Sequence, residues 1–114
     1  MTKLRWKNFL VPALYYGAIL SVSLIPRSGI EEVNLFIPLP NDKVLHFAVY
    51  GGFGFVLGGL PYPSVVLGTV GSFLGAADEQ IQRLAPGRAV SMADWLADIL
   101  GISLGLAWRR RPRK

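Results

Sequence analysis

The most restrictive feature of this chain is a stretch without formal charge that runs from Lys43 to Asp78, with His46 near its start. Over all 114 residues, 52% are hydrophobic and only 17% are charged. A water-soluble domain usually carries about 25% charged residues. This number of charged residues is too small to cover a surface that faces water. The sequence therefore predicts a chain surrounded by lipid.

Four apolar segments are long enough to form short transmembrane helices, because about 17 residues is the lower limit for crossing a bilayer. The first has a basic start like a signal peptide, but no A-x-A-like site follows it, so we expect a retained helix. The predicted fold is an all-α membrane protein, one domain over residues 1–114, forming a compact bundle of four short transmembrane helices. They are expected at about residues 9–25, 43–60, 64–82 and 92–108, followed by a basic tail at 109–114.

The distribution of charge predicts the orientation of this bundle. Eight of the 12 basic residues lie near the two ends of the chain, and all seven acids lie between them. Because cytoplasmic segments are enriched in Lys and Arg, both termini are expected in the cytoplasm. The same distribution argues against nucleic acid as a partner. Residues 28–41 then lie outside, either as an interfacial segment or as an irregular loop over the bundle.

Small residues recur one helical turn apart in every predicted span. The pairs are Gly54 and Gly58, Gly71 and Gly75, Gly101 and Gly105, and the weaker Gly17 and Ser21. Small residues at this spacing let helix backbones approach closely. The pattern therefore predicts tight packing between the helices.

Three helix ends are expected to meet at the outer surface, and each carries polar residues at helical spacing. Their polar faces could converge at one depth and form a binding site. The polar positions are Asp42, His46 and Tyr50 on the second helix, Asp78, Glu79 and Gln82 on the third, and Asp94 and Asp98 on the fourth. Two have ordinary structural explanations: Asp42 can cap its helix, and Ser91 with Asp94 fits a capping box.

His46 and Asp98 lie one turn inside their helices, where ionisable groups usually face a cavity or a partner. Asp78 and Glu79 lie near a helix C-terminus, whose dipole disfavours negative charge. They need compensation from Arg83, Arg88, His46 or a bound cation. Arg88 could instead bind an anionic head group, and a salt bridge to Asp78 or Glu79 is the alternative.

The chain has no cysteine and one histidine, which argues against a structural zinc site and leaves no specific metal prediction. A divalent cation at the carboxylates stays open, and no cofactor is required. If the protein is an enzyme, His46, Asp78 and Glu79 are the expected catalytic residues.

The order of motifs resembles the VanZ-like family of small bacterial membrane proteins, named for resistance to the glycopeptide teicoplanin. The resemblance rests on DKVLHFAVYGGFGF (residues 42–55) and DEQIQRLAPGRAVSMADWLADILG (residues 78–101). The matching positions are Asp42, Lys43, His46, Tyr50, Asp78, Glu79, Gln82, Pro86, Gly87, Arg88, Asp94 and Gly101. The chain departs from the pattern at Asp98, where an asparagine is expected.

The resemblance implies a multi-pass protein of the bacterial cytoplasmic (inner) membrane, without implying an agreed activity. Our first hypothesis is binding of an anionic lipid or envelope-precursor head group by the outward polar cluster. The residues expected to bind it are Asp42, Lys43, His46, Tyr50, Asp78, Glu79, Gln82, Arg88, Asp94 and Asp98. The alternatives are an enzyme acting on a lipid-linked substrate, with His46 as acid or base, and a structural or partner-binding module. Membrane lipids or envelope precursors are the expected partners, and a homo-oligomer stays open.

Overall fold

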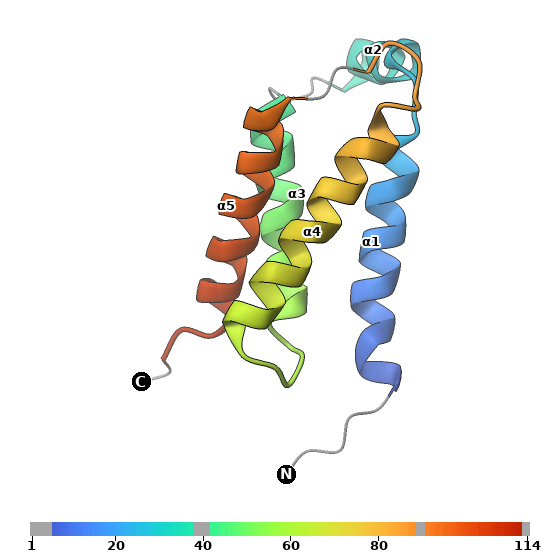
Figure 1. Ribbon diagram of the computed structural model, residues 1–114. Helices are drawn as coiled ribbons and strands as arrows, with labels where there is room; N and C mark the ends of the chain where they lie inside the picture. Colours follow the sequence, from blue (N-terminus) through green and yellow to red (C-terminus); the bar gives the residue numbers. More distant parts are fainter. Residues whose placement is uncertain (1–5, 38–41, 89–90, 113–114) are drawn as a thin grey trace.

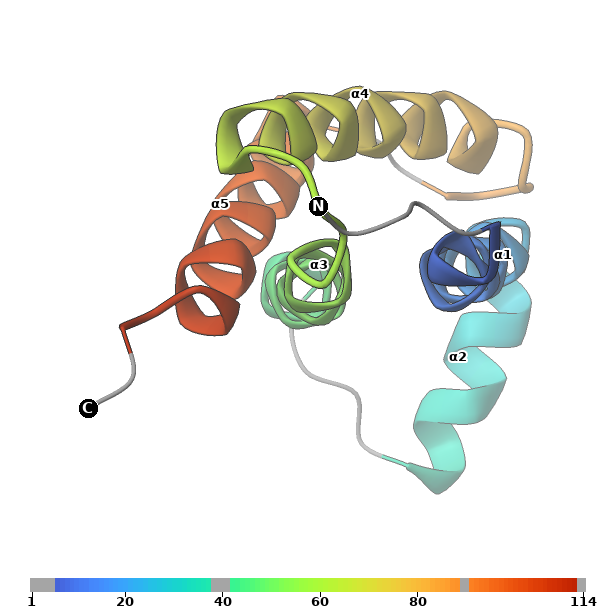
Figure 2. The same cartoon turned by 90° about the horizontal axis from the view of Figure 1, so that it is seen from below.

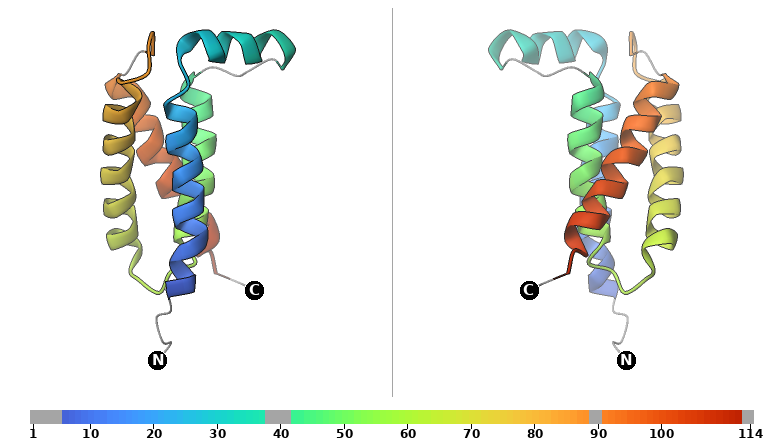
Figure 3. Two further views of the ribbon diagram at one scale, coloured as in Figure 1. Left: turned by 90° about the vertical axis from the view of Figure 1, so that its right-hand side faces the viewer. Right: turned by 90° about the vertical axis from the view of Figure 1, so that its left-hand side faces the viewer.

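The computed structural model describes residues 6–37, 42–88 and 91–112, and all regular elements in these ranges are helical (Figure 1). A short 3-10 helix, η1 (Trp6–Phe9), leads into α1 (Leu10–Ser23). The other helices are α2 (Arg27–Phe36), α3 (Asp42–Leu57), α4 (Ser64–Gln82) and α5 (Met92–Arg109). Helices α1, α3, α4 and α5 run along one bundle, and α2 lies across one end of it (Figure 3).

The four long helices cover the same parts of the chain as the four predicted helices. The remaining helix, α2, lies where the sequence predicts either an interfacial segment or an irregular loop. It turns away from the helix before it by 100° and buries none of its side chains. It therefore does not pack over the bundle as a covering loop. Part of the predicted segment, residues 38–41, lies outside the described residues.

The tightest packing joins α3 and α5, whose backbones touch through glycines. A Cβ atom at Gly101 would stand 2.5 Å from the carbonyl oxygen of Phe47. A Cβ at Gly105 would collide with the carbonyl of Gly51, and one at Gly54 with the backbone of Ile102. The predicted role of small residues in packing is confirmed for this pair of helices.

Helix α1 is held against the bundle by two tyrosines. Tyr15 donates a hydrogen bond to the carbonyl of Val49 at 2.6 Å, and Tyr16 donates to Leu74 at 2.5 Å. Both rings stack on Phe53, which is buried in the core. Seen along the bundle, α3 lies between α5 and α1, with α4 along one side (Figure 2). The weaker predicted motif at Gly17 does not contribute, because a Cβ there would meet nothing within 4 Å.

The end of the bundle opposite α2 is closed by arginines. Arg110 reaches back to the turn between α3 and α4, where it donates to the carbonyls of Gly58 and Leu60 and to the hydroxyl of Ser64. Arg109 lies over the ring of Phe55 at 4.8 Å from its centre. The part of the basic tail that the structure describes is thus attached to the bundle.

Large apolar side chains lie on the surface of the bundle as well as in its core. Val65, Phe73 and Trp108 expose 75%, 73% and 62% of their surface. The interior holds the apolar core and, beside it, buried acids that include Asp78 and Asp98. Within the described ranges, no single helix is both long and apolar enough to cross a membrane. The segments Lys7–Ser23 and Arg27–Phe36, which are bent by 100° relative to each other, meet these criteria of length and composition only when they are taken together.

The glycine contact predicts a sharp difference between two Gly→Ala substitutions. Alanine normally stabilises a helix by about 0.5–1 kcal/mol relative to glycine. At Gly105 the added methyl meets backbone, which cannot rotate away, so Gly105→Ala should lower stability by about 1–3 kcal/mol. Gly17→Ala is the matched control and should be neutral or stabilising. Thermal unfolding of the purified proteins, followed by circular dichroism, measures both; equal effects would contradict the packing described.

Candidate functional site

The buried polar residues gather at the end of the bundle nearest α2, where α1 and α4 end and α3 and α5 begin. The helix ends place them at one level, as the sequence predicted for the second, third and fourth spans. Those that are buried are Ser23, Asp78, Glu79, Gln82, Asp94 and Asp98. Four of them, together with Tyr50 and His46, form two adjoining groups with different hydrogen bonding.

The first, which we call the Asp78 group, consists of Asp78, Tyr50 and Ser23. The carboxylate of Asp78 accepts a 2.6 Å hydrogen bond from the Tyr50 hydroxyl on one oxygen and a short one from the Ser23 hydroxyl on the other. These bonds join α1, α3 and α4. Sequence reasoning missed Ser23, because a single serine at the end of an apolar span carries no distinctive signal. In this group the charge of Asp78 is matched by donors from two other helices.

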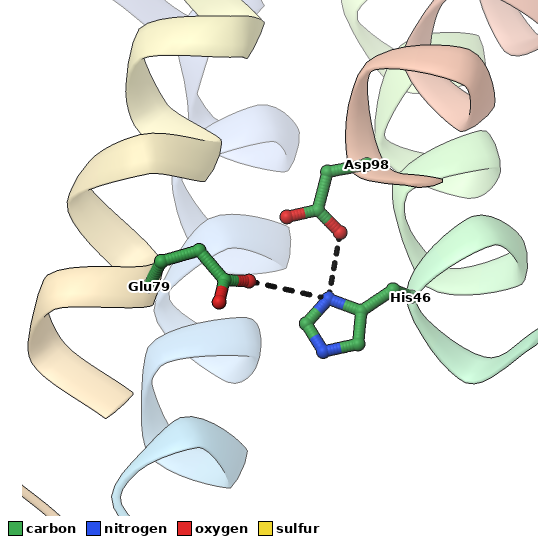
Figure 4. Close-up of side chains that lie close together, drawn as sticks. All are labelled: His46, Glu79 and Asp98. Atoms are coloured by element: carbon green, nitrogen blue, oxygen red, sulfur yellow. Dashed lines mark hydrogen bonds and ion pairs between the residues drawn. The ribbon is translucent and has the colours of Figure 1, made fainter. Parts of the chain in front are cut away.

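The second, the His46 group, consists of His46, Glu79 and Asp98, from α3, α4 and α5 (Figure 4). Nδ1 of His46 lies 2.7 Å from Oδ1 of Asp98 and 3.5 Å from Oε1 of Glu79. Only the shorter distance is that of a good hydrogen bond. Because Nδ1 can carry a single proton, it satisfies Asp98 and leaves Glu79 with a weaker electrostatic contact.

The His46 group therefore contains buried oxygen atoms without hydrogen-bond partners. They are both carboxylate oxygens of Glu79 and Oδ2 of Asp98. The side chains of Glu79 and Asp98 are 5% and 0% exposed, so bulk water does not supply the missing donors. Leaving such atoms unsatisfied costs free energy. This half of the site has acceptor capacity that the chain does not use.

Ser91 and Lys43 lie at the rim of the site. Ser91 caps α5, and its hydroxyl accepts a 3.2 Å hydrogen bond from the backbone N–H of Asp94, which confirms the predicted cap. Nζ of Lys43 lies 3.7 Å from Oδ1 of Asp94. Lys43 is 57% exposed, so it forms the boundary between the buried acids and the surroundings.

Arg88 does not enter the carboxylate cluster. Its guanidinium donates to the carbonyls of Val22 and Ile25, at 3.2 and 2.7 Å, and so satisfies the C-terminal end of α1. The alternative that it pairs with Asp78 or Glu79 is not observed among the described contacts. Arg83 is exposed, and Asp42 begins α3 with a side chain outside the described residues.

The charges of the site are unequal. Among the described contacts, Asp78 is paired only with the hydroxyls of Tyr50 and Ser23, and the other three acids have only His46 and Lys43 as cationic or protonatable partners. Helix dipoles help Asp94 and Asp98, which lie in the first two turns of α5, and oppose Glu79 near the end of α4. The arrangement suits the binding of a proton or a cation more directly than that of an anion.

Comparison of the chain with protein-family models, curated proteins and solved structures gives no match.

The Asp78 group predicts strong coupling between two substitutions. Asp78→Ala leaves two buried hydroxyls without an acceptor and should cost about 3 kcal/mol, whereas Tyr50→Phe should cost about 1–2 kcal/mol. The double variant should be more stable than the sum of the two predicts, by about 1 kcal/mol. Chemical unfolding of the four proteins completes this cycle. Glu31→Gln, in the exposed pair with Arg27, is the control and should change little; strict additivity would contradict the bonding scheme.

Proposed function

We propose that this protein is an integral membrane protein of the bacterial cell envelope, VanZ-like in kind, that binds an anionic lipid or envelope-precursor head group at the α2 end of its bundle. The observation that carries the membrane location is the exposure of large apolar side chains on several helices. Leu14, Phe73 and Leu104 are exposed on three different helices. Exposed apolar side chains in such number are costly in water and suit lipid.

The length of the helices and the position of their acids support the same proposal. α4 and α5 have 19 and 18 residues, which at about 1.5 Å per residue is close to the thickness of a hydrocarbon core of about 30 Å. Their acids lower the mean hydropathy of each helix. Yet Asp78, Glu79 and Asp98 are buried against other helices and would not meet lipid.

The two ends of the bundle differ in a way that supports cytoplasmic termini. Arg109, Arg110 and Arg111 lie at the end opposite α2, as expected for a cytoplasmic face. At the other end, Leu35 and Phe36 of α2 are both 82% exposed. A helix perpendicular to the spans with such residues is suited to lie in the lipid–water interface.

The head group would meet the site through its rim, because the acids themselves repel an anion. Lys43 is the exposed cation there. His46 keeps 12% of its side chain exposed, and its second ring nitrogen, Nε2, points away from both carboxylates (Figure 4). When protonated, Nε2 donates to a phosphate oxygen. Lys43 and His46, and not Arg88, are therefore the proposed head-group contacts.

A second candidate function, hydrolysis or transfer on a lipid-linked substrate, is favoured by one observation. The 2.7 Å contact between Asp98 and Nδ1 of His46 orients the ring so that a neutral Nε2 could act as a general base. If so, purified protein should change the composition of an envelope lipid extract, and His46→Gln should abolish the change. Identical extracts before and after incubation would exclude it.

The membrane topology can be tested by single-cysteine labelling, since the chain has no cysteine of its own. Ser28→Cys on α2 should react with an impermeant maleimide in intact cells. Pro61→Cys, in the turn between α3 and α4, should react only after permeabilisation. Phe73→Cys should react in neither case, because lipid excludes the reagent and disfavours the thiolate. Fast labelling of Phe73→Cys in intact cells would contradict the membrane location.

Head-group binding can be tested by native mass spectrometry in detergent, with phosphatidylglycerol and phosphatidylethanolamine as probes. The anionic lipid should bind more tightly. Lys43→Gln and His46→Gln should each weaken it about 10-fold, as expected for the loss of a charged hydrogen bond. Lys7→Gln, at the opposite end, is the matched control. An equal loss in the control would mean that binding depends only on net charge.

A further inference from the structure

The unused oxygen atoms of the His46 group point to a ligand beyond the head group. Glu79 and Asp98 are more than nine-tenths buried, and their side chains are directed toward the same ring nitrogen from two other helices (Figure 4). One nitrogen of His46 and one oxygen from each acid lie within 4.8 Å of one another. Three of the carboxylate oxygens in this space have no hydrogen-bond partner.

We propose that His46, Glu79 and Asp98 form a binding site for a divalent first-row transition-metal ion. Two carboxylates with a neutral imidazole carry two negative charges, which one dication cancels. With metal–ligand bonds of about 2.0–2.2 Å, tetrahedral ligand atoms stand about 3.3–3.6 Å apart. The three atoms lie within 4.8 Å of one another, so side-chain movements of about 1 Å bring them to coordinating distance.

The ligand types decide which ions fit. Carboxylates alone would suit Mg²⁺ or Ca²⁺, but an imidazole ligand favours ions such as Zn²⁺, and Mn²⁺ accepts both kinds of donor. Coordination through Nδ1 replaces the hydrogen bond from His46 to Asp98 and leaves the proton on Nε2. Three protein ligands also leave a coordination position for water or for an oxygen of a bound molecule.

The neighbouring groups are arranged to support this site without joining it. Asp78 has both oxygens engaged by Tyr50 and Ser23, so it is not available as a ligand. Gly75 of α4 packs beside Asp98 of α5, where a Cβ would stand 3.5 Å from the aspartate, at ordinary contact distance. The three ligands are thus held on packed helices and not on loops, which fixes their geometry.

The experiment uses the purified full chain in detergent without added lipid, so its outcome is independent of head-group binding. After removal of metal with a chelator, Zn²⁺ and Mn²⁺ should bind about one per chain and raise the unfolding temperature, as any ligand of the folded state does. Mg²⁺ and Ca²⁺ at the same concentration should have a smaller effect. Absence of saturable Zn²⁺ and Mn²⁺ binding, or equal binding of Mg²⁺, would overturn the assignment.

Isosteric variants locate the ion. Glu79→Gln and Asp98→Asn keep the side-chain shape and should each weaken Zn²⁺ binding by about 10–100-fold or more, the range found even for supporting residues of metal sites. Glu32→Gln, an exposed acid of α2, is the matched control and should bind normally. Unchanged affinity in both site variants would overturn the proposal.

A spectroscopic measurement on the unmodified chain covers the case in which a variant fails to fold. Bound Mn²⁺ should show electron-spin coupling to the ¹⁴N of the single histidine, His46. Bound Mn²⁺ without this nitrogen coupling would exclude His46 as a ligand and with it the proposed site.

Discussion

The contact between α3 and α5 determines where the rest of the structure lies. Gly101 fits against Phe47 and Gly51, and Gly105 fits against Gly51. This sets the register of two helices that run in the same direction (Figure 1). Asp98 lies one turn before Gly101, so the same register places it opposite His46. The polar site is therefore a consequence of backbone packing several ångströms away, and a shift of one residue would separate its members.

Burial of four acids in an apolar bundle requires specific compensation, because an isolated buried charge costs several kcal/mol. Asp78 is stabilised by hydroxyl donors from two helices, and Asp94 by the start of α5 and by Lys43. Asp98 has the imidazole of His46. Glu79 has the least: it lies near the unfavourable end of α4, its closest cation is 3.5 Å away, and neither oxygen has a hydrogen bond. Glu79 thus carries two of the four buried carboxylate oxygens that lack a hydrogen-bond partner in the described residues, and Asp94 and Asp98 carry one each.

Much of the architecture could be predicted from the sequence, because apolar run length and glycine spacing are local properties. The four long helices, the glycine packing, the Ser91 cap and the meeting of three polar helix faces all follow from them. Contacts between distant segments do not. Nothing local indicates that Ser23 binds Asp78, or that Arg88 prefers the carbonyls ending α1 to a carboxylate. The helical form of α2 was not predicted, because this short segment has neither the length nor the uniform hydropathy of a span.

The two adjoining groups divide structural and functional roles within one site. The Asp78 group is saturated: its donors and acceptors match, so its effect is to join helices. The His46 group is not: three of its buried carboxylate oxygens lack a hydrogen-bond partner, which leaves acceptor capacity for a proton or a cation. Asp98 belongs to this second group. An asparagine at position 98 would accept the same hydrogen bond from His46 without adding charge, whereas Asp98 adds a second carboxylate beside Glu79. Replacing a neutral acceptor with a charged one increases the cost of leaving the site empty. It also strengthens any cation site there.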